Sequence, residues 1–160
     1  MAKEVPLEKK IITQEAVFDF SKLYKDMKEW FDKRQYVFHE TAHEQKEEAA
    51  GTKLEIQWGA EREITNYFKF KIKIMIFGIE MEKLQTEEGN IVYQGNIKII
   101  IDGTLIMDYK DKFKDSKFLE LIQKVYNDTL IKKKIELYII KLSKETEEIR
   151  ELIKEHLQLY

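Results

Sequence analysis

Apolar and polar positions follow a helical period in the first part of this chain. Over residues 14–33 the apolar side chains recur every three or four positions, and Thr13 is a suitable N-cap residue. We therefore predict an amphipathic helix whose apolar side comprises Val17, Phe20, Leu23, Tyr24, Met27, Trp30 and Phe31. Residues 1–12 are polar and have no period, so we expect them to form a flexible arm.

The period then changes to two, which is typical of strands with one buried face. Residues 36–46 and 52–58 alternate on either side of an expected turn at 48–51, and Gly59 is expected to begin another turn. In YFKFKIKIMIF the aromatic and isoleucine side chains point one way and the lysines point the other. After Gly78 the apolar phase slips, as it does at a β-bulge. With the turn at 87–90 and a fourth strand from Ile91, the pattern predicts an antiparallel meander.

Helical spacing returns in the last third of the chain. Asp115 or Ser116 can cap a helix that reaches about Asn127, and a longer helix is expected at about 131–159. Alternating steps of four and three connect Ile135, Ile139, Leu142, Thr146, Ile149, Ile153, His156 and Tyr160, which is the spacing of a coiled-coil seam. At 1.5 Å per residue this helix would be about 45 Å long, so we expect part of the seam to bind another protein or a second copy.

Together these elements predict a single α+β domain. It would contain an N-terminal helix, a four-stranded antiparallel meander sheet and C-terminal helices packed on one face of that sheet. The domain would span residues 13–160, after the arm at 1–12.

Composition excludes several classes of function. The 28 basic and 30 acidic residues nearly cancel, which argues against a nucleic-acid partner. No apolar run is long enough for a membrane span or signal peptide, so we expect no membrane association. The absence of cysteine removes thiol chemistry and fits a cytoplasmic location.

The residues His39, Glu40 and His43 match the His-Glu-x-x-His signature of zinc peptidases. In that signature a helix brings both imidazoles to one ion, and the glutamate acts as base. A helix here would have only three alanines to bury, and Glu44 stands where such peptidases normally carry an uncharged residue. On a strand, the two histidines would share one face about 13 Å apart, too far to bind one ion. We interpret the segment as half of a β-hairpin and keep the zinc hydrolase as the alternative.

Other chemical signatures are absent. The glycines form no phosphate-binding motif, and Asp102, Asp108 and Asp111 do not have EF-hand spacing. We therefore assign no catalytic residue and no cofactor. The lysines of KFKIKI are interpreted as a solvated sheet face, and an apolar ligand cavity beneath the helices is an alternative to a filled core.

The runs KEWFDKR, EIQW, ITNYFKFKIKI and LIMDYKD resemble parts of small archaeal proteins of unknown function. The resemblance covers about residues 24–160 and implies a common fold without an activity. By architecture the expected elements are also similar to cystatin-like or helix-grip folds.

We therefore predict a noncatalytic binding or structural module, not an enzyme. It would act through protein–protein association, with a protein partner or a homo-oligomer formed through the C-terminal helix. The alternatives are the zinc-dependent hydrolase and a carrier of an apolar small molecule or lipid.

Overall fold

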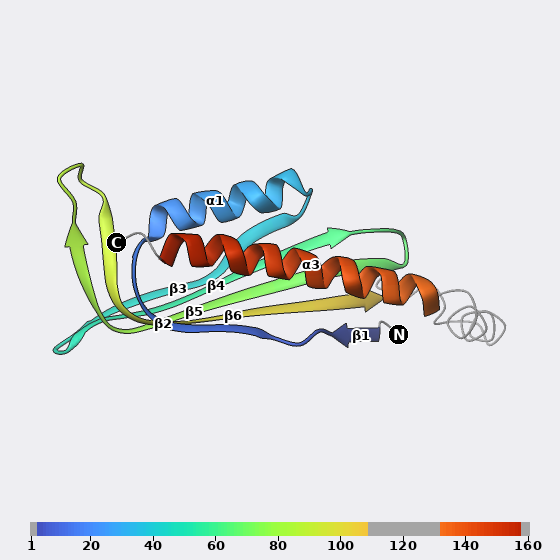
Figure 1. Cartoon of the computed structure of the whole chain (residues 1–160), viewed down its shortest axis with the longest axis horizontal. Helices are drawn as coiled ribbons and strands as arrows, with labels where there is room; N and C mark the ends of the chain where they lie inside the picture. Colours follow the sequence, from blue (N-terminus) through green and yellow to red (C-terminus); the bar gives the residue numbers. More distant parts are fainter. Residues whose placement is uncertain (1–2, 109–131, 158–160) are drawn as a thin grey trace.

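A computed structural model describes residues 3–108 and 132–157, which fold into one antiparallel sheet and two helices (Figure 1). In chain order the elements are β1 (Lys3–Pro6), β2 (Lys10–Asp19), α1 (Phe20–Lys33), β3 (Val37–Glu48), β4 (Gly51–Glu63), β5 (Phe68–Gln85), β6 (Ile91–Met107) and α3 (Lys132–Leu157). The α+β class is confirmed. The helix expected up to Asn127 lies outside the described residues.

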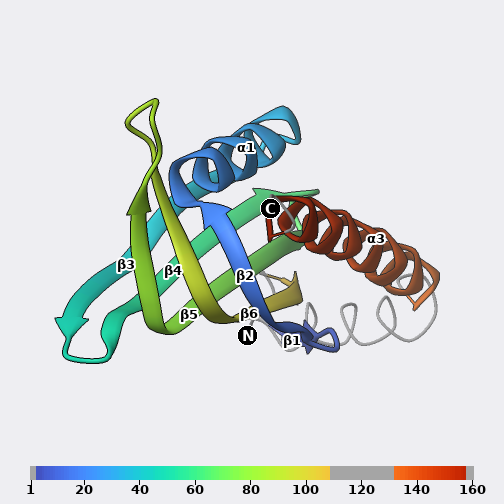
Figure 2. The ribbon, with the colours of Figure 1, turned by 60° about the vertical axis from the view of Figure 1, so that its left-hand side comes forward.

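The sheet contains six strands in the order β1-β6-β5-β4-β3, and β2 also pairs with β6. Strands β3 to β6 form the expected meander. Strands β1 and β2 lie end to end along the free edge of β6, where Lys3 pairs with Met107 and Lys10 pairs with Ile101. Both helices cover one face of the sheet, here called the inner face, and the opposite face is the outer face (Figure 2).

The N-terminal prediction was wrong in two respects. Residues 1–12 were expected to be a flexible arm, but 3–6 and 10–12 belong to strands, which raises the strand count from four to six. The helix expected over 14–33 begins only at Phe20, because Asp19 caps it by accepting a hydrogen bond from the Lys22 amide. Residues 10–19 instead pair with β6, and Ile12, Ala16 and Phe18 point inward.

The end of α1 is closed by a Schellman motif. The Tyr36 amide donates to the Phe31 carbonyl, the Gln35 amide donates to the Asp32 carbonyl, and Gln35 has a φ of 63°. This turn sends the chain directly into β3 and places Tyr36 in the core.

A bulge in β5 accounts for the slipped apolar phase after Gly78. Ile79 pairs with Asn96 and Glu82 pairs with Gln94, so Glu80 and Met81 together face Gly95. Glu80 has a φ of 55°, and Met81 is buried. The bulge coincides with the bend where the end of β5 and the beginning of β6 turn toward α1 (Figure 1). The expected turn at Gly59 is wrong, because β4 continues through this residue to Glu63.

The apolar side of α3 packs on its own sheet. Leu142, Ile149 and Ile153 are fully buried, and Thr146 and His156 are also buried. At Gly103 of β6 the helix approaches so closely that an added Cβ would lie 3.0 Å from Thr146 Cγ2. The prediction that this seam is available to a partner is therefore wrong for residues 142–156.

Candidate functional site

The segment containing His39, Glu40 and His43 is a strand, as the hairpin interpretation predicts. Strand β3 pairs with β4 from Val37↔Glu61 to Glu48↔Gly51, through a turn at Ala49 and Ala50. A zinc-peptidase signature requires a helix, so this segment does not meet that condition.

A β-bulge places the two histidines on opposite faces of the sheet, which corrects the expectation that they share one. Glu40 pairs with Trp58 and Ala42 pairs with Gln57, so Thr41 is an extra residue. His39 lies over Gly59 on the outer face, where its Nε2 would be 3.4 Å from an added Cβ. Beyond the bulge, His43 pairs with the buried Ile56 and its ring contacts Phe20 edge-on at a centroid distance of 5.4 Å.

Glu40 and His43 therefore meet on the inner face without His39. The Glu40 Oε1 atom lies 3.1 Å from His43 Nδ1 and accepts a hydrogen bond from Trp58 Nε1 at 3.3 Å. Residues 3–108 and 132–157 contain no group of three or more histidine, aspartate or glutamate side chains that could hold a metal ion. Of the predicted signature, only Glu40 and His43 meet, and they form a local contact between β3, β4 and α1.

The other acidic and basic residues considered in the sequence analysis do not come together in one site either. Asp102 lies on the outer face opposite Lys73, Asp108 is buried at the end of β6, and Asp111 lies outside the described residues. Lys71 and Lys73 are exposed on the outer face, and Lys69 forms a 2.6 Å ion pair with Glu61. The solvated lysine face matches its prediction.

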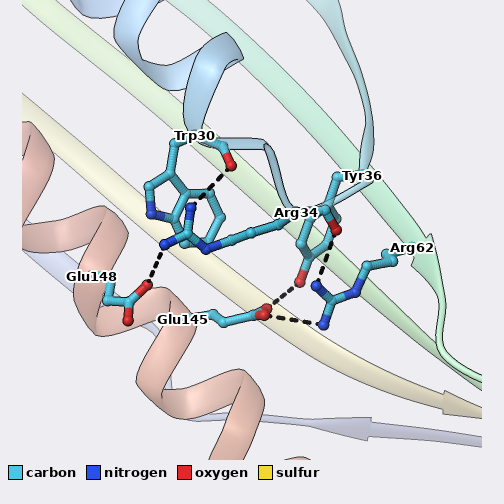
Figure 3. A network of polar contacts seen from close by, with 6 residues as sticks. All are labelled: Trp30, Arg34, Tyr36, Arg62, Glu145 and Glu148. Atoms are coloured by element: carbon cyan, nitrogen blue, oxygen red, sulfur yellow. Dashed lines mark hydrogen bonds and ion pairs between the residues drawn. The ribbon is translucent and has the colours of Figure 1, made fainter. Parts of the chain in front are cut away.

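Sequence reasoning missed a buried polar network beneath α3 (Figure 3). Glu145 of α3 is only 7% exposed; it accepts a hydrogen bond from the Tyr36 hydroxyl at 2.5 Å and one from Arg62 Nη2 at 3.0 Å. The Arg62 guanidinium also donates to the Arg34 carbonyl and lies over the Tyr36 ring. The network joins α3, β4 and the turn after α1 through one carboxylate.

A second, more exposed pair extends this network. Arg34 donates to Glu148 at 3.1 Å and to the Trp30 carbonyl at 3.2 Å, and its guanidinium lies 3.9 Å from the centroid of the Trp30 ring. Burial and the hydrogen bond to Glu145 raise the pKa of Tyr36. The phenol therefore stays protonated and keeps donating to the carboxylate. Because its central carboxylate is buried and bound by Tyr36 and Arg62, we interpret the network as a structural connection.

The outer face of the sheet carries a cluster of apolar side chains. Ile11, Ile100 and Met75 lie side by side across β2, β6 and β5, and Phe77 and Ile79 continue along β5. Ile11 is 53% exposed and Ile79 is 60% exposed. We call these five residues the outer apolar patch. A polar outer face is the rule when one side of an antiparallel sheet meets water, so this patch is a candidate interaction surface.

The surroundings of the patch combine a hollow with charges of both signs. A hollow of about 440 Å³ lies beside Phe77 and Ile79. Three lysines and three acidic residues surround the patch on the same face: Lys53, Lys73, Lys98, Glu15, Glu55 and Asp102.

Comparisons with known proteins give no family for this chain. No family model, no curated protein and no solved structure matches it. The resemblance to small archaeal proteins stays a prediction. Neither helix of the described ranges is long and apolar enough to cross a membrane.

Proposed function

We propose that this chain is a noncatalytic module that acts through protein–protein association, and that its outer apolar patch pairs with the same patch of a second copy. The observation that supports this proposal is the outer face, which neither α1 nor α3 covers: five apolar side chains adjoin one another on three neighbouring strands. This surface replaces the seam of α3, whose central residues are used within the domain.

Shape and charge both favour a second copy as the occupant. A two-fold interface places one patch against itself, so the patch must contain features that complement each other. Here the exposed Ile79 side chain adjoins a hollow, which gives both a projection and a recess. The surrounding charges are balanced, so a rotated copy can bring Lys98 or Lys73 against Glu15 or Glu55.

Sedimentation velocity of the full chain at concentrations on the order of 100 µM tests this proposal. We expect a dimer of twice 19.3 kDa. The variant Ile79→Lys should be monomeric, because it places a charge within the outer apolar patch. Val37→Lys is the matched control: Val37 is 70% exposed but lies on β3, away from the patch, so this variant should still form the dimer. A monomeric wild-type protein, or equal behaviour of the two variants, would refute the proposal.

Neither alternative has comparable support. The hydrolase needs two histidines on one side of the backbone, and the bulge at Thr41 separates His39 from His43. A carrier with a central cavity needs space between the middle of the sheet and the helices, but the inner side chains there, including Trp58, Phe70 and Ile74, are at most 1% exposed and form one packed cluster with α3.

A further inference from the structure

A second binding site is suggested at the edge of the sheet, where α3 passes over the junction between β1 and β2. The chain leaves the edge of β6 after Pro6 and returns to it at Lys10. Between these strands the Leu7 amide still donates to the Gly103 carbonyl at 2.9 Å. The interruption leaves a cavity of about 480 Å³ between this segment and α3, here called the edge cavity. Its size lies within the range of about 300–1,000 Å³ that is typical of small-molecule sites.

The walls of the edge cavity have two kinds of surface. Val5, Leu7 and Ile139 contribute apolar side chains. Five charged residues also line it and together carry one net positive charge: Glu8, Lys9, Lys10, Glu147 and Arg150. An apolar wall with a few converging polar groups is the usual composition of a site for an amphipathic small molecule.

The charges in the cavity leave one positive charge uncompensated. Lys10 Nζ lies 2.7 Å from Glu147 Oε2, and Arg150 Nη1 lies 3.3 Å from Glu147 Oε1. One carboxylate thus bridges two cations. These ion pairs lower the pKa of Glu147, with Lys10 as the main cause, so its carboxylate stays ionised at neutral pH. The carboxylate of a ligand would neutralise the remaining positive charge of Lys10, Glu147 and Arg150.

Arg150 retains hydrogen-bonding capacity for such a group. A guanidinium has five N–H donors, and Arg150 directs one nitrogen, Nη1, at Glu147. Its Nε atom is buried and has no acceptor within the described residues, which is the only such side-chain atom found there. This buried atom is not accessible from the cavity, so a ligand would be bound by the Nη1 and Nη2 donors of the guanidinium.

We propose that the edge cavity binds a small monocarboxylate with an apolar chain, and that Lys10 and Arg150 hold its carboxylate. The apolar chain would lie against Val5, Leu7 and Ile139. Glu147 competes with the ligand for both cations. Ile11 belongs to the outer apolar patch and also lines the edge cavity, but Ile79 does not line it. Ile79→Lys therefore tests the dimer without changing the edge cavity, and either proposal can fail without the other.

Isothermal titration of the full chain with octanoate tests this inference, with octanamide and inorganic phosphate as the comparison ligands. We expect saturable binding of octanoate. Octanamide should bind at least about tenfold more weakly, because it lacks the charge, and phosphate should bind weakly because it lacks the chain. Absence of saturable octanoate binding, or equal binding of octanamide, would overturn the proposal.

Substitutions at neighbouring positions should change the affinity in opposite directions. Arg150→Met should weaken octanoate binding at least about tenfold, whereas Glu147→Gln should strengthen it by freeing both cations. Lys144→Met removes one positive charge from the same helix outside the cavity and should leave the affinity within about twofold. If Arg150→Met does not fold, Lys10→Met replaces it. Weaker binding in Glu147→Gln, or equal losses in Lys144→Met and Arg150→Met, would overturn the assignment.

Discussion

Single residues determine where the polar groups of this protein meet. Thr41 adds one residue to β3, and His43 consequently moves from the face of His39 to the face of Glu40. No pattern in the sequence indicates this bulge, because it depends on how β3 pairs with β4. The burial of Glu145 could have been predicted from the sequence. It adjoins Thr146 on the apolar side of α3, so it is a charged residue in a stretch that must be buried.

The charge of Arg62 should matter far more for stability than the charge of Glu148. Arg62→Met removes the cation that faces the buried Glu145 carboxylate, and we expect the free energy of unfolding to fall by about 3–5 kcal/mol. Glu148→Gln breaks a pair in which the Glu148 side chain is 42% exposed, and the expected loss is about 0–1 kcal/mol. Urea unfolding of both variants measures the difference. Similar losses would mean that Glu145 does not depend on Arg62.

Tyr36 should make the protein sensitive to high pH. Its pKa is raised in the folded state, so its contribution to stability is complete below the unfolded pKa of about 10 and is lost as the pH rises above that value. Above pH 10 the free energy of unfolding should fall by about 1.4 kcal/mol per pH unit from this residue. Urea unfolding between about pH 9 and pH 11 measures this loss, and Tyr36→Phe should lack that part of it. Parallel pH profiles of the two proteins would contradict the expectation.

At the scale of elements, the sequence predicted the strands and helices whose apolar residues follow a clear period of two or of three to four. The meander, the hairpin at 36–58, the phase slip after Gly78 and the last helix were all predicted correctly. The boundary between β2 and α1 was not, because Val17 and Phe20 fit a helical spacing although Val17 belongs to a strand. Ile11, Ile12 and Thr13 are β-branched and were the available signal for a strand.

The turn after α1 offers a gain in stability. Gln35 has a positive φ, which costs a residue with a side chain more than it costs glycine. We expect Gln35→Gly to raise the free energy of unfolding by about 0.5–1 kcal/mol. Lys33→Gly, two residues earlier at the last position of the helix, should lower it by about 0.5–1 kcal/mol. Thermal unfolding of the two variants checks the opposite signs. A loss in both would mean that the turn does not require a left-handed residue.

At the scale of the whole molecule, stability depends on how closely α3 approaches the sheet. Gly103→Ala would place a methyl group 3.0 Å from Thr146 Cγ2, and we expect a loss of about 1–3 kcal/mol from overpacking. Thr146→Ser removes that methyl group and keeps the hydroxyl that donates to the Ser143 carbonyl, so Gly103→Ala should cost less in this background. A double-mutant cycle by urea unfolding measures the coupling. Additive losses would place the helix farther from the strand.

The position of α3 also bears on how the fold is assembled. The sheet joins the first and last strands of the described chain, since β1 and β2 both pair with β6, and its inner face is closed only when α3 reaches it. During synthesis, the isoleucines and aromatics of that face would stay uncovered until α3 has emerged from the ribosome. Until that helix packs on the sheet, the nascent polypeptide exposes an apolar surface to which chaperones can bind.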